Sequence, residues 1–103
     1  MSGEEGIGIF DSTIHNVEKS IERAAKIQEV IAHNIANANT SGYVPEKFDE
    51  VLNKAVKRTD KSSVNLEEEV ADLAKNSARF SAYVKIMTAK LGMLRSVVTQ
   101  GRK

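Results

Sequence analysis

The stretch "IAHNIANANTSGY" (residues 31–43) ends one long apolar pattern and begins a turn. Asparagine is a mediocre helix former that favours caps and turns, so three asparagines in this stretch indicate a helix end. Either Asn39 or Gly42 can take the left-handed conformation that commonly ends a helix. We therefore expect the chain to turn over five residues, which are Asn39, Thr40, Ser41, Gly42 and Tyr43.

Upstream of this turn, one residue set repeats at alternating steps of four and three: Phe10, Ile14, Val17, Ile21, Ala24, Gln28, Ile31, Ile35 and Ala38. This spacing is the 3.5-residue period of a coiled-coil seam. Gln28 is its one polar member. The pattern predicts a helix over residues 11–39, which Asp11 or Ser12 can cap.

A second seam follows the same rule near the end of the chain: Leu66, Val70, Leu73, Ser77, Phe80, Val84, Met87, Leu91, Leu94 and Val98. Asn65 and Glu68 resemble a capping box, and basic residues follow the acidic first turn, as the helix dipole favours. We predict a helix over residues 65–100.

The two long helices predict an all-α fold in which they pack antiparallel as a coiled coil, within a single domain of residues 1–103. We expect the intrachain seam to be formed by Ile14, Val17, Ile21, Ile31, Ile35, Phe80, Val84, Met87, Leu91 and Leu94. Residues 1–10 carry three glycines and no apolar period, which is typical of a flexible arm. Residues 40–64 form the connection, in which apolar residues at helical spacing predict a short amphipathic helix over about 46–57.

Further apolar residues flank the two seams, and a two-helix monomer would leave them in water. Because each buried side chain of this size contributes about 1.5–3 kcal/mol, the flanking rows favour contacts with other subunits. We assign these contacts to Ile27, Val30, Asn34, Asn37, Ile86, Met93 and Val97. The alternative is that the short middle helix covers one of the rows.

The sequence contains few groups of residues that could form a catalytic or metal-binding site. His15 and His33 share a helix face but are separated by about 27 Å, so they cannot share a metal ion. The chain contains no cysteine, and we expect no catalytic group, cofactor, metal or small-molecule substrate. The net charge is +1, and the basic residues of the second helix are spread around it, so a solvated face is favoured over a surface for nucleic acid or membrane. The N-terminus lacks the pattern of a cleaved signal peptide.

Two motifs nevertheless resemble a known family. Residues 31–43 are similar to the N-terminal signature of flagellar rod and hook proteins, in which an Asn-x-x-Asn pair leads into Thr-Pro-Gly-Tyr; Ser41 stands here in place of the proline. Residues 64–103 resemble the proximal members of the flagellar basal-body rod family at Asn-Leu-Glu (65–67), Leu-Ala-x-Asn (73–76) and Leu-x-Met-Leu-Arg (91–95). The segment "EKFDEVLNKAV" (46–56) also fits, although the chain is shorter than is usual in the family.

The resemblance implies a structural subunit, not an enzyme, whose terminal helices assemble into a torque-transmitting tube across the periplasm. It implies export through the flagellar type III apparatus without a cleaved signal peptide. It also implies contacts with the export-gate adaptor FliE, the membrane ring protein FliF and a rod subunit of the FlgC type. The alternatives are that this chain is itself a rod subunit of the FlgC type, or a small helical adaptor.

Overall fold

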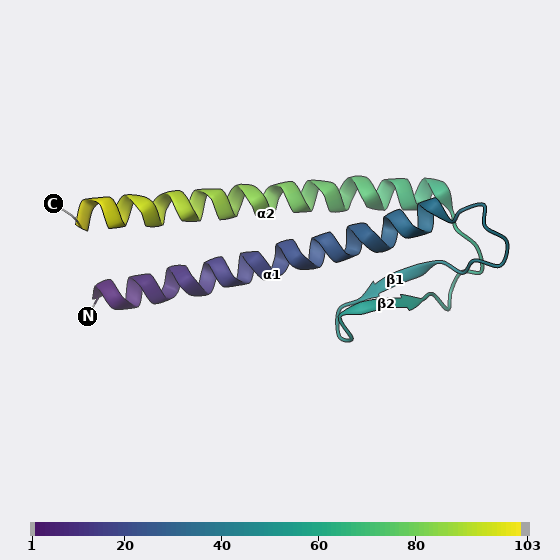
Figure 1. Cartoon of the computed structure of the whole chain (residues 1–103), viewed down its shortest axis with the longest axis horizontal. Helices are drawn as coiled ribbons and strands as arrows, with labels where there is room; N and C mark the ends of the chain where they lie inside the picture. Colours follow the sequence, from purple (N-terminus) through teal and green to yellow (C-terminus); the bar gives the residue numbers. More distant parts are fainter. Residues whose placement is uncertain (1, 102–103) are drawn as a thin grey trace.

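The computed structural model describes the backbone of residues 2–101 and the side chains of residues 12–101. Helix α1 (Ser2–Ala36) and helix α2 (Leu66–Gly101) lie side by side and antiparallel, so both termini lie at one end of the molecule (Figure 1). Strands β1 (Glu46–Asp49) and β2 (Lys54–Lys57) form a hairpin between them in the sequence. The molecule is a rod with extents of 65 × 23 × 14 Å.

The two long antiparallel helices predicted from the seams are confirmed. The cap of α2 is also present, because the backbone N–H of Glu68 donates to Asn65 Oδ1 at 3.2 Å. The Glu68 carboxylate does not complete a capping box. It accepts a hydrogen bond from Lys61 Nζ at 2.9 Å instead.

The prediction of a short helix over residues 46–57 is wrong, because these residues form the β-hairpin. The strands pair antiparallel, with Phe48 opposite Ala55. The loop between them is held by a hydrogen bond from the backbone N–H of Leu52 to Asp49 Oδ1 at 2.9 Å, and Asn53 takes a left-handed φ of 55°. A left-handed residue ends a helix but suits a hairpin loop. Pro45 also favours an extended backbone before the first strand.

The ends of α1 differ from the expected bounds. The helix begins at Ser2 instead of residue 11, so its backbone includes the segment that we expected to be an irregular arm. Glycine costs about 1 kcal/mol in a helix interior but does not forbid the helix, so the glycines there were a weak signal. At the other end the helix stops at Ala36, and the left-handed residue of the turn is Gly42, with a φ of 78°.

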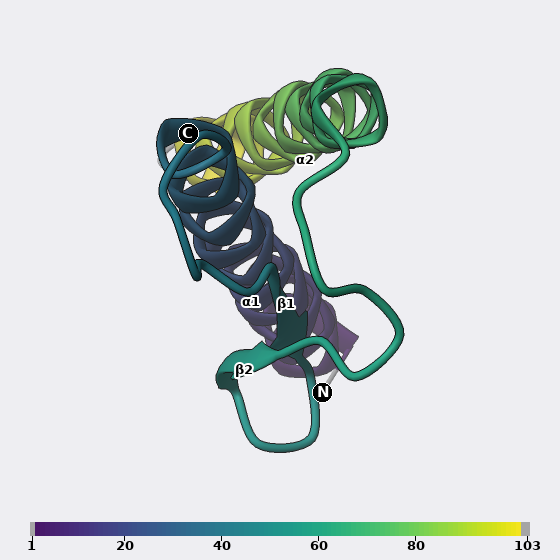
Figure 2. The ribbon, with the colours of Figure 1, turned by 90° about the vertical axis from the view of Figure 1, so that its right-hand side faces the viewer.

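The core lies in the half of the rod that is nearest the turn. Its buried apolar residues are Ala24, Val30 and Ile31 of α1, and its buried polar residues are Asn34, Glu69 and Asn76. Figure 2 shows that the hairpin lies on the side of α1, and β1 packs against that helix. The three elements α1, α2 and β1 therefore enclose the core, while the half of the rod with the termini consists of the two helices alone.

Candidate assembly surfaces

Asn34 is the most buried polar residue of the core, with 1% of its surface exposed. Its Nδ2 donates to the carbonyl oxygen of Glu46 at 2.8 Å and to Glu69 Oε1 at 3.1 Å. Its Oδ1 accepts from the Tyr43 hydroxyl at 2.6 Å and from the backbone N–H of Glu46 at 2.9 Å. One amide thus joins α1, the turn, β1 and α2, and we call these four residues the Asn34 clasp.

The residues around the clasp keep the Tyr43 hydroxyl a hydrogen-bond donor and hold its ring in place. Burial, with the nearby carboxylates of Glu46 and Glu69, raises the pKa of the Tyr43 hydroxyl, which therefore stays protonated and donates. The His33 ring packs edge-on against Tyr43, with ring centroids 5.5 Å apart. His33 Nε2 also lies 3.7 Å from Glu46 Oε1. The clasp is consequently held from the exposed side as well as from the core.

The assignment of Asn34 and Val30 to contacts between subunits is corrected by these positions. Both side chains are buried inside the chain, Asn34 in the clasp and Val30 in the apolar core. Helical spacing alone placed them in one row with Ile27. It could not show that the hairpin would fold back over that row. This outcome agrees in part with the alternative that the middle segment covers one row, although the covering element is a hairpin.

Asn37 has a local role at the end of α1. Its Nδ2 donates to the His33 carbonyl oxygen at 2.9 Å, and its Oδ1 accepts from the Thr40 hydroxyl at 3.1 Å. The His33 carbonyl also accepts from the backbone N–H of Asn37 at 3.1 Å, so the side-chain bonds of Asn37 add to the helix end and hold the turn in place. Of the predicted turn, Asn39, Thr40, Ser41 and Gly42 are exposed and Tyr43 is half-buried.

A second polar group lies where the two helices meet. Asn76 Nδ2 donates to Gln28 Oε1 at 2.9 Å and to the Ala24 carbonyl oxygen at 2.8 Å. Gln28 Nε2 donates to Ser77 Oγ at 3.3 Å. The single polar members of the two predicted seams, Gln28 and Ser77, therefore lie opposite each other, with Asn76 beside them. A polar layer of this kind fixes the register of two helices.

The predicted intrachain seam is unevenly covered along the rod. Ile31 is buried, and six seam residues are half-buried, namely Ile14, Val17, Ile21, Ile35, Met87 and Leu94. Three others stay exposed, with Phe80 at 37%, Val84 at 39% and Leu91 at 45% of their surface. Along α2 the coverage is therefore uneven, because the half-buried Met87 and Leu94 alternate with the exposed Val84 and Leu91.

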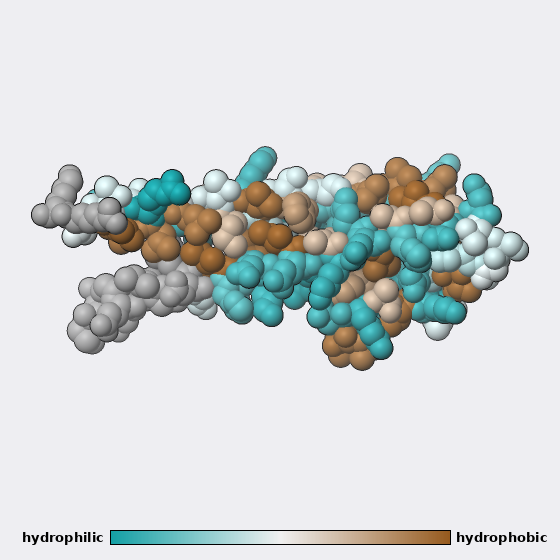
Figure 3. All heavy atoms as spheres, in the orientation of Figure 1, coloured by the Kyte–Doolittle hydropathy of each residue, from teal (hydrophilic) through white to brown (hydrophobic). Residues whose placement is uncertain are grey.

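Three of the residues assigned to subunit contacts are exposed on α2. Ile86, Met93 and Val97 have 43%, 50% and 48% of their surface exposed. Ile27 is half-buried. Leu91 and Val98 are also exposed but lie on the other side of α2, in its seam, and Figure 3 shows hydrophobic atoms along α2 toward the C-terminal end. We call Leu91, Met93, Val97 and Val98 the α2 apolar surface.

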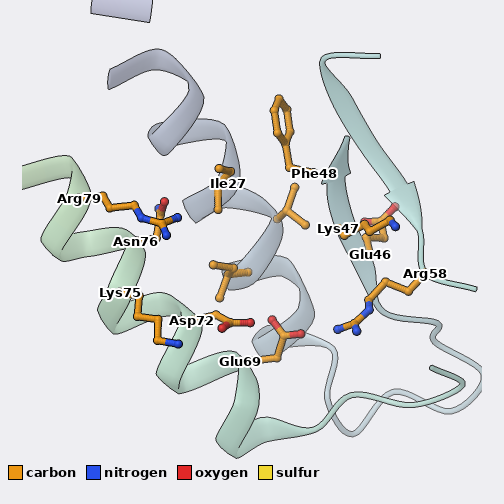
Figure 4. A pocket seen from close by; sticks show the side chains of 12 residues that line it. Ile27, Glu46, Lys47, Phe48, Arg58, Glu69, Asp72, Lys75, Asn76 and Arg79 are labelled. Atoms are coloured by element: carbon orange, nitrogen blue, oxygen red, sulfur yellow. The ribbon is translucent and has the colours of Figure 1, made fainter. Parts of the chain in front are cut away.

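A cavity of about 320 Å³ lies between α1, α2 and β1, on the hairpin side of the helix pair (Figure 4). Charged side chains of both signs border it, among them Arg79 and Asp72 of α2 and Arg58, which follows β2. Its lining contains no Ser, Thr, Cys or His. The cavity therefore gives no indication of a nucleophile with an adjacent base.

Ion pairs hold the loop after β2 to the start of α2. Arg58 lies 2.6 Å from Asp60 Oδ2 and 3.7 Å from Glu68 Oε1. The hydrogen bond from Arg58 lowers the pKa of Asp60 to about 2, and Lys61 likewise lowers the pKa of Glu68. Asp60 is exposed and its partners are half-buried, so these pairs position the loop more than they stabilise the core.

In the part of the chain that the structure describes, no three His, Asp or Glu side chains are placed to hold a metal ion. Neither described helix is both long enough and apolar enough to cross a membrane.

Sequence reasoning missed Glu69 and Asn76, the two buried polar residues of α2. Glu69 was interpreted as a helix-start charge, and Asn76 lies one position before the seam. The sequence signal for them is that a carboxylate and an amide, which need hydrogen-bond partners when buried, flank the apolar Val70 and Leu73. That signal does not identify their partners, which lie more than 30 residues away on α1.

Comparisons with known proteins agree with the resemblance seen in the sequence. The family model described as "Flagella basal body rod protein" matches residues 22–43, the half of α1 and the turn that contain Gln28 and Asn34. The flagellar basal body rod protein FlgB of Bacillus subtilis (strain 168) is 27% identical over 129 aligned residues, covering 93% of this chain and 100% of that protein. The alignment is longer than the 103 residues of this chain, so the relative has residues without a counterpart here.

Proposed function

From the similarity of this chain to flagellar basal-body rod proteins of the FlgB type, we propose that it is a structural subunit of the proximal rod. Its two helices assemble with those of neighbouring subunits into a helical tube. The tube transmits torque across the periplasm. In this proposal the chain acts through surfaces between subunits and does not need a catalytic group.

The observation that carries the proposal is the α2 apolar surface. Its four residues, on two sides of the helix, are each exposed by 45–50%. Burial of such side chains contributes about 1.5–3 kcal/mol each, so their exposure in one copy favours association. A rod of two helices that is closed by a clasp at one end and open at the other is suited to lateral packing with further helices.

The proposed partners follow from the place of the FlgB type in the basal body. They are a rod subunit of the FlgC type, the export-gate adaptor FliE and the membrane ring protein FliF. The flagellar type III apparatus would export the chain before assembly. Ile86, Met93 and Val97 remain our proposed subunit contacts, and the half-buried Ile27 is a further candidate beside the hairpin.

The test replaces two residues of the α2 apolar surface, Met93→Ser together with Val97→Ser. Both side chains are half-exposed, so the monomer should keep its helical circular dichroism. We expect the variant to be expressed but absent from detergent-extracted basal bodies, with motility lost. Ala89→Ser, an exposed change on the same helix, is the matched control and should keep both. Normal basal-body content of the double variant would refute the proposed role of this surface.

A further inference from the structure

We propose that the hairpin tip of one copy docks into a groove between α1 and α2 of a second copy. The inference deepens the proposed function and rests on it in one respect: it names a contact through which identical subunits would join. The tip and the groove belong to the same chain but lie on different sides of it.

The tip is formed by two adjacent apolar residues in the loop between β1 and β2. Val51 has 94% and Leu52 has 57% of its surface exposed. Figure 3 shows the tip as a hydrophobic patch below the helix pair. The hydrogen bond from Leu52 N–H to Asp49 Oδ1 fixes the loop. An apolar tip that is already ordered loses little conformational entropy when it binds, which favours docking.

The groove is open and mainly apolar. It has a volume of about 380 Å³ and is lined by Ala25, Gln28, Ser77, Phe80 and Ser81. The Phe80 side chain is 37% exposed and offers an apolar wall. The polar groups of Gln28 are already bonded to Asn76 and Ser77. An apolar tip can therefore cover the Gln28 amide oxygen while that oxygen keeps the hydrogen bond from Asn76; an unpaired acceptor would cost free energy.

The tip cannot reach the groove of its own chain. The cavities on the hairpin side are lined by Ile27, Asn76 and Arg79 together with hairpin residues. The groove is lined instead by Ala25 of α1 and Ser77 of α2, which point to a different side of the helix pair from Ile27 and Asn76. No hairpin residue lines it. The contact must therefore form between two copies. In such a pair, one copy still has a free groove and the other still has a free tip. The heterologous contact can therefore repeat and build an open assembly.

Charges beside the tip and the groove are complementary. Glu18 and Glu22 are exposed and share a face of α1 with Ala25, since the three residues are separated by steps of four and three. Glu29 lines a cavity with Ala55 of its own hairpin instead. The hairpin carries exposed lysines at positions 54 and 57 of β2. The acidic residue of the tip, Glu50, lies instead in a cavity with Arg23 and Arg79 of its own helices. A docked hairpin would thus bring lysines to an acidic helix face, which favours this pairing over a like-charged surface.

The decisive experiment uses the absence of cysteine from the chain. One preparation carries Leu52→Cys and a second carries Ser81→Cys, and the two purified proteins are mixed under mild oxidation. We expect a disulfide-linked heterodimer between tip and groove. Ser63→Cys replaces Ser81→Cys in the control, because Ser63 is an equally exposed serine in the loop before α2. A heterodimer yield no higher than in the control overturns the proposal, and so does a protein that stays monomeric at every concentration.

Two further variant sets test the same contact without cysteine. Val51→Ser with Leu52→Ser should weaken self-association in sedimentation by about a hundredfold, since two apolar side chains lose their burial. Glu18→Lys with Glu22→Lys should also weaken it, and mixing with Lys54→Glu, Lys57→Glu protein should restore association between the two variants. Unaltered self-association of the serine variant overturns the proposal. These assays use purified protein, so the docking contact can fail while basal-body incorporation stands, and the reverse.

Discussion

Asn34 joins segments that are far apart in the sequence through a single side-chain amide. Each of its polar atoms has two hydrogen bonds, and the donors and acceptors come from Tyr43, Glu46 and Glu69. An amide is suited to this position because it both donates and accepts. Neither a carboxylate nor an apolar residue of similar size could satisfy all four groups.

We predict that Asn34→Ala destabilises the fold by about 3 kcal/mol, because it leaves the buried Glu69 carboxylate and the half-buried Tyr43 hydroxyl without this partner. Urea unfolding followed by circular dichroism measures the change. Asn39→Ala, at an exposed position of the turn, is the control and should stay within about 0.5 kcal/mol of the wild type. Equal stability of the two variants would show that the clasp does not hold the fold together.

The ion pairs after β2 predict a dependence on pH. The pKa of Asp60 is lowered to about 2 and that of Glu68 is also lowered, so the folded state binds fewer protons than the unfolded state in mild acid. Their contribution to stability is therefore present above about pH 4.5 and is lost as the pH falls toward 2. Because Asp60 is exposed and Glu68 is half-buried, solvent screens both ion pairs and the effect is small.

Arg58→Gln removes the main partner of Asp60 and should flatten the fall in urea midpoint between pH 6 and pH 3. Arg79→Gln removes an equal charge elsewhere and should leave the slope unchanged. If Arg58→Gln follows the wild-type pH profile, the ion pairs make no contribution in acid.

Asn34, Asn37 and Asn39 show how much could be predicted from residue types and spacing. The sequence indicated that Asn39 to Gly42 would end the helix, and the turn begins where the asparagines cluster. It did not separate Asn34 from Asn37, which share a helix face but differ in burial. That difference depends on a hairpin whose position follows from the tertiary fold and not from helical spacing.

At the scale of elements, the two long helices were predictable and the hairpin was not. A 3.5-residue period sustained over many turns is a strong signal, because few other structures bury it. In residues 46–57 the apolar spacing also fitted a helix, but Val51 and Leu52 occupy the exposed loop instead. A short segment carries too few apolar positions for periodicity alone to distinguish a helix from two strands.

Asn53 gives a test of the hairpin. Its φ of 55° is accessible to glycine and tolerated by asparagine, whereas a β-branched residue is strained there. Asn53→Val should destabilise the hairpin by about 1–2 kcal/mol, and Asn53→Gly should be close to neutral. Amide hydrogen exchange of the β1–β2 ladder compares them. Equal protection in both variants would contradict a left-handed backbone at this position.

At the scale of the whole molecule, the core occupies one half of the rod. Among the residues whose side chains the structure describes, the buried ones of α1 and α2 all lie between Ala24 and Asn34 or between Glu69 and Asn76. The sequence predicted two antiparallel rods with more apolar surface than one chain can cover. It could not show which stretch would be covered, because that depends on the side to which the hairpin folds.

The Asn34 clasp and the polar layer of Gln28, Asn76 and Ser77 both lie toward the closed end of this rod. Local opening costs least where few side chains are buried. The molecule should therefore unzip from its two termini toward the turn, with the outer turns of α2 exchanging their amide hydrogens first. Helices that open readily at that end can exchange one neighbour for another while the closed end keeps its shape, so a subunit can be added to a growing structure without first unfolding.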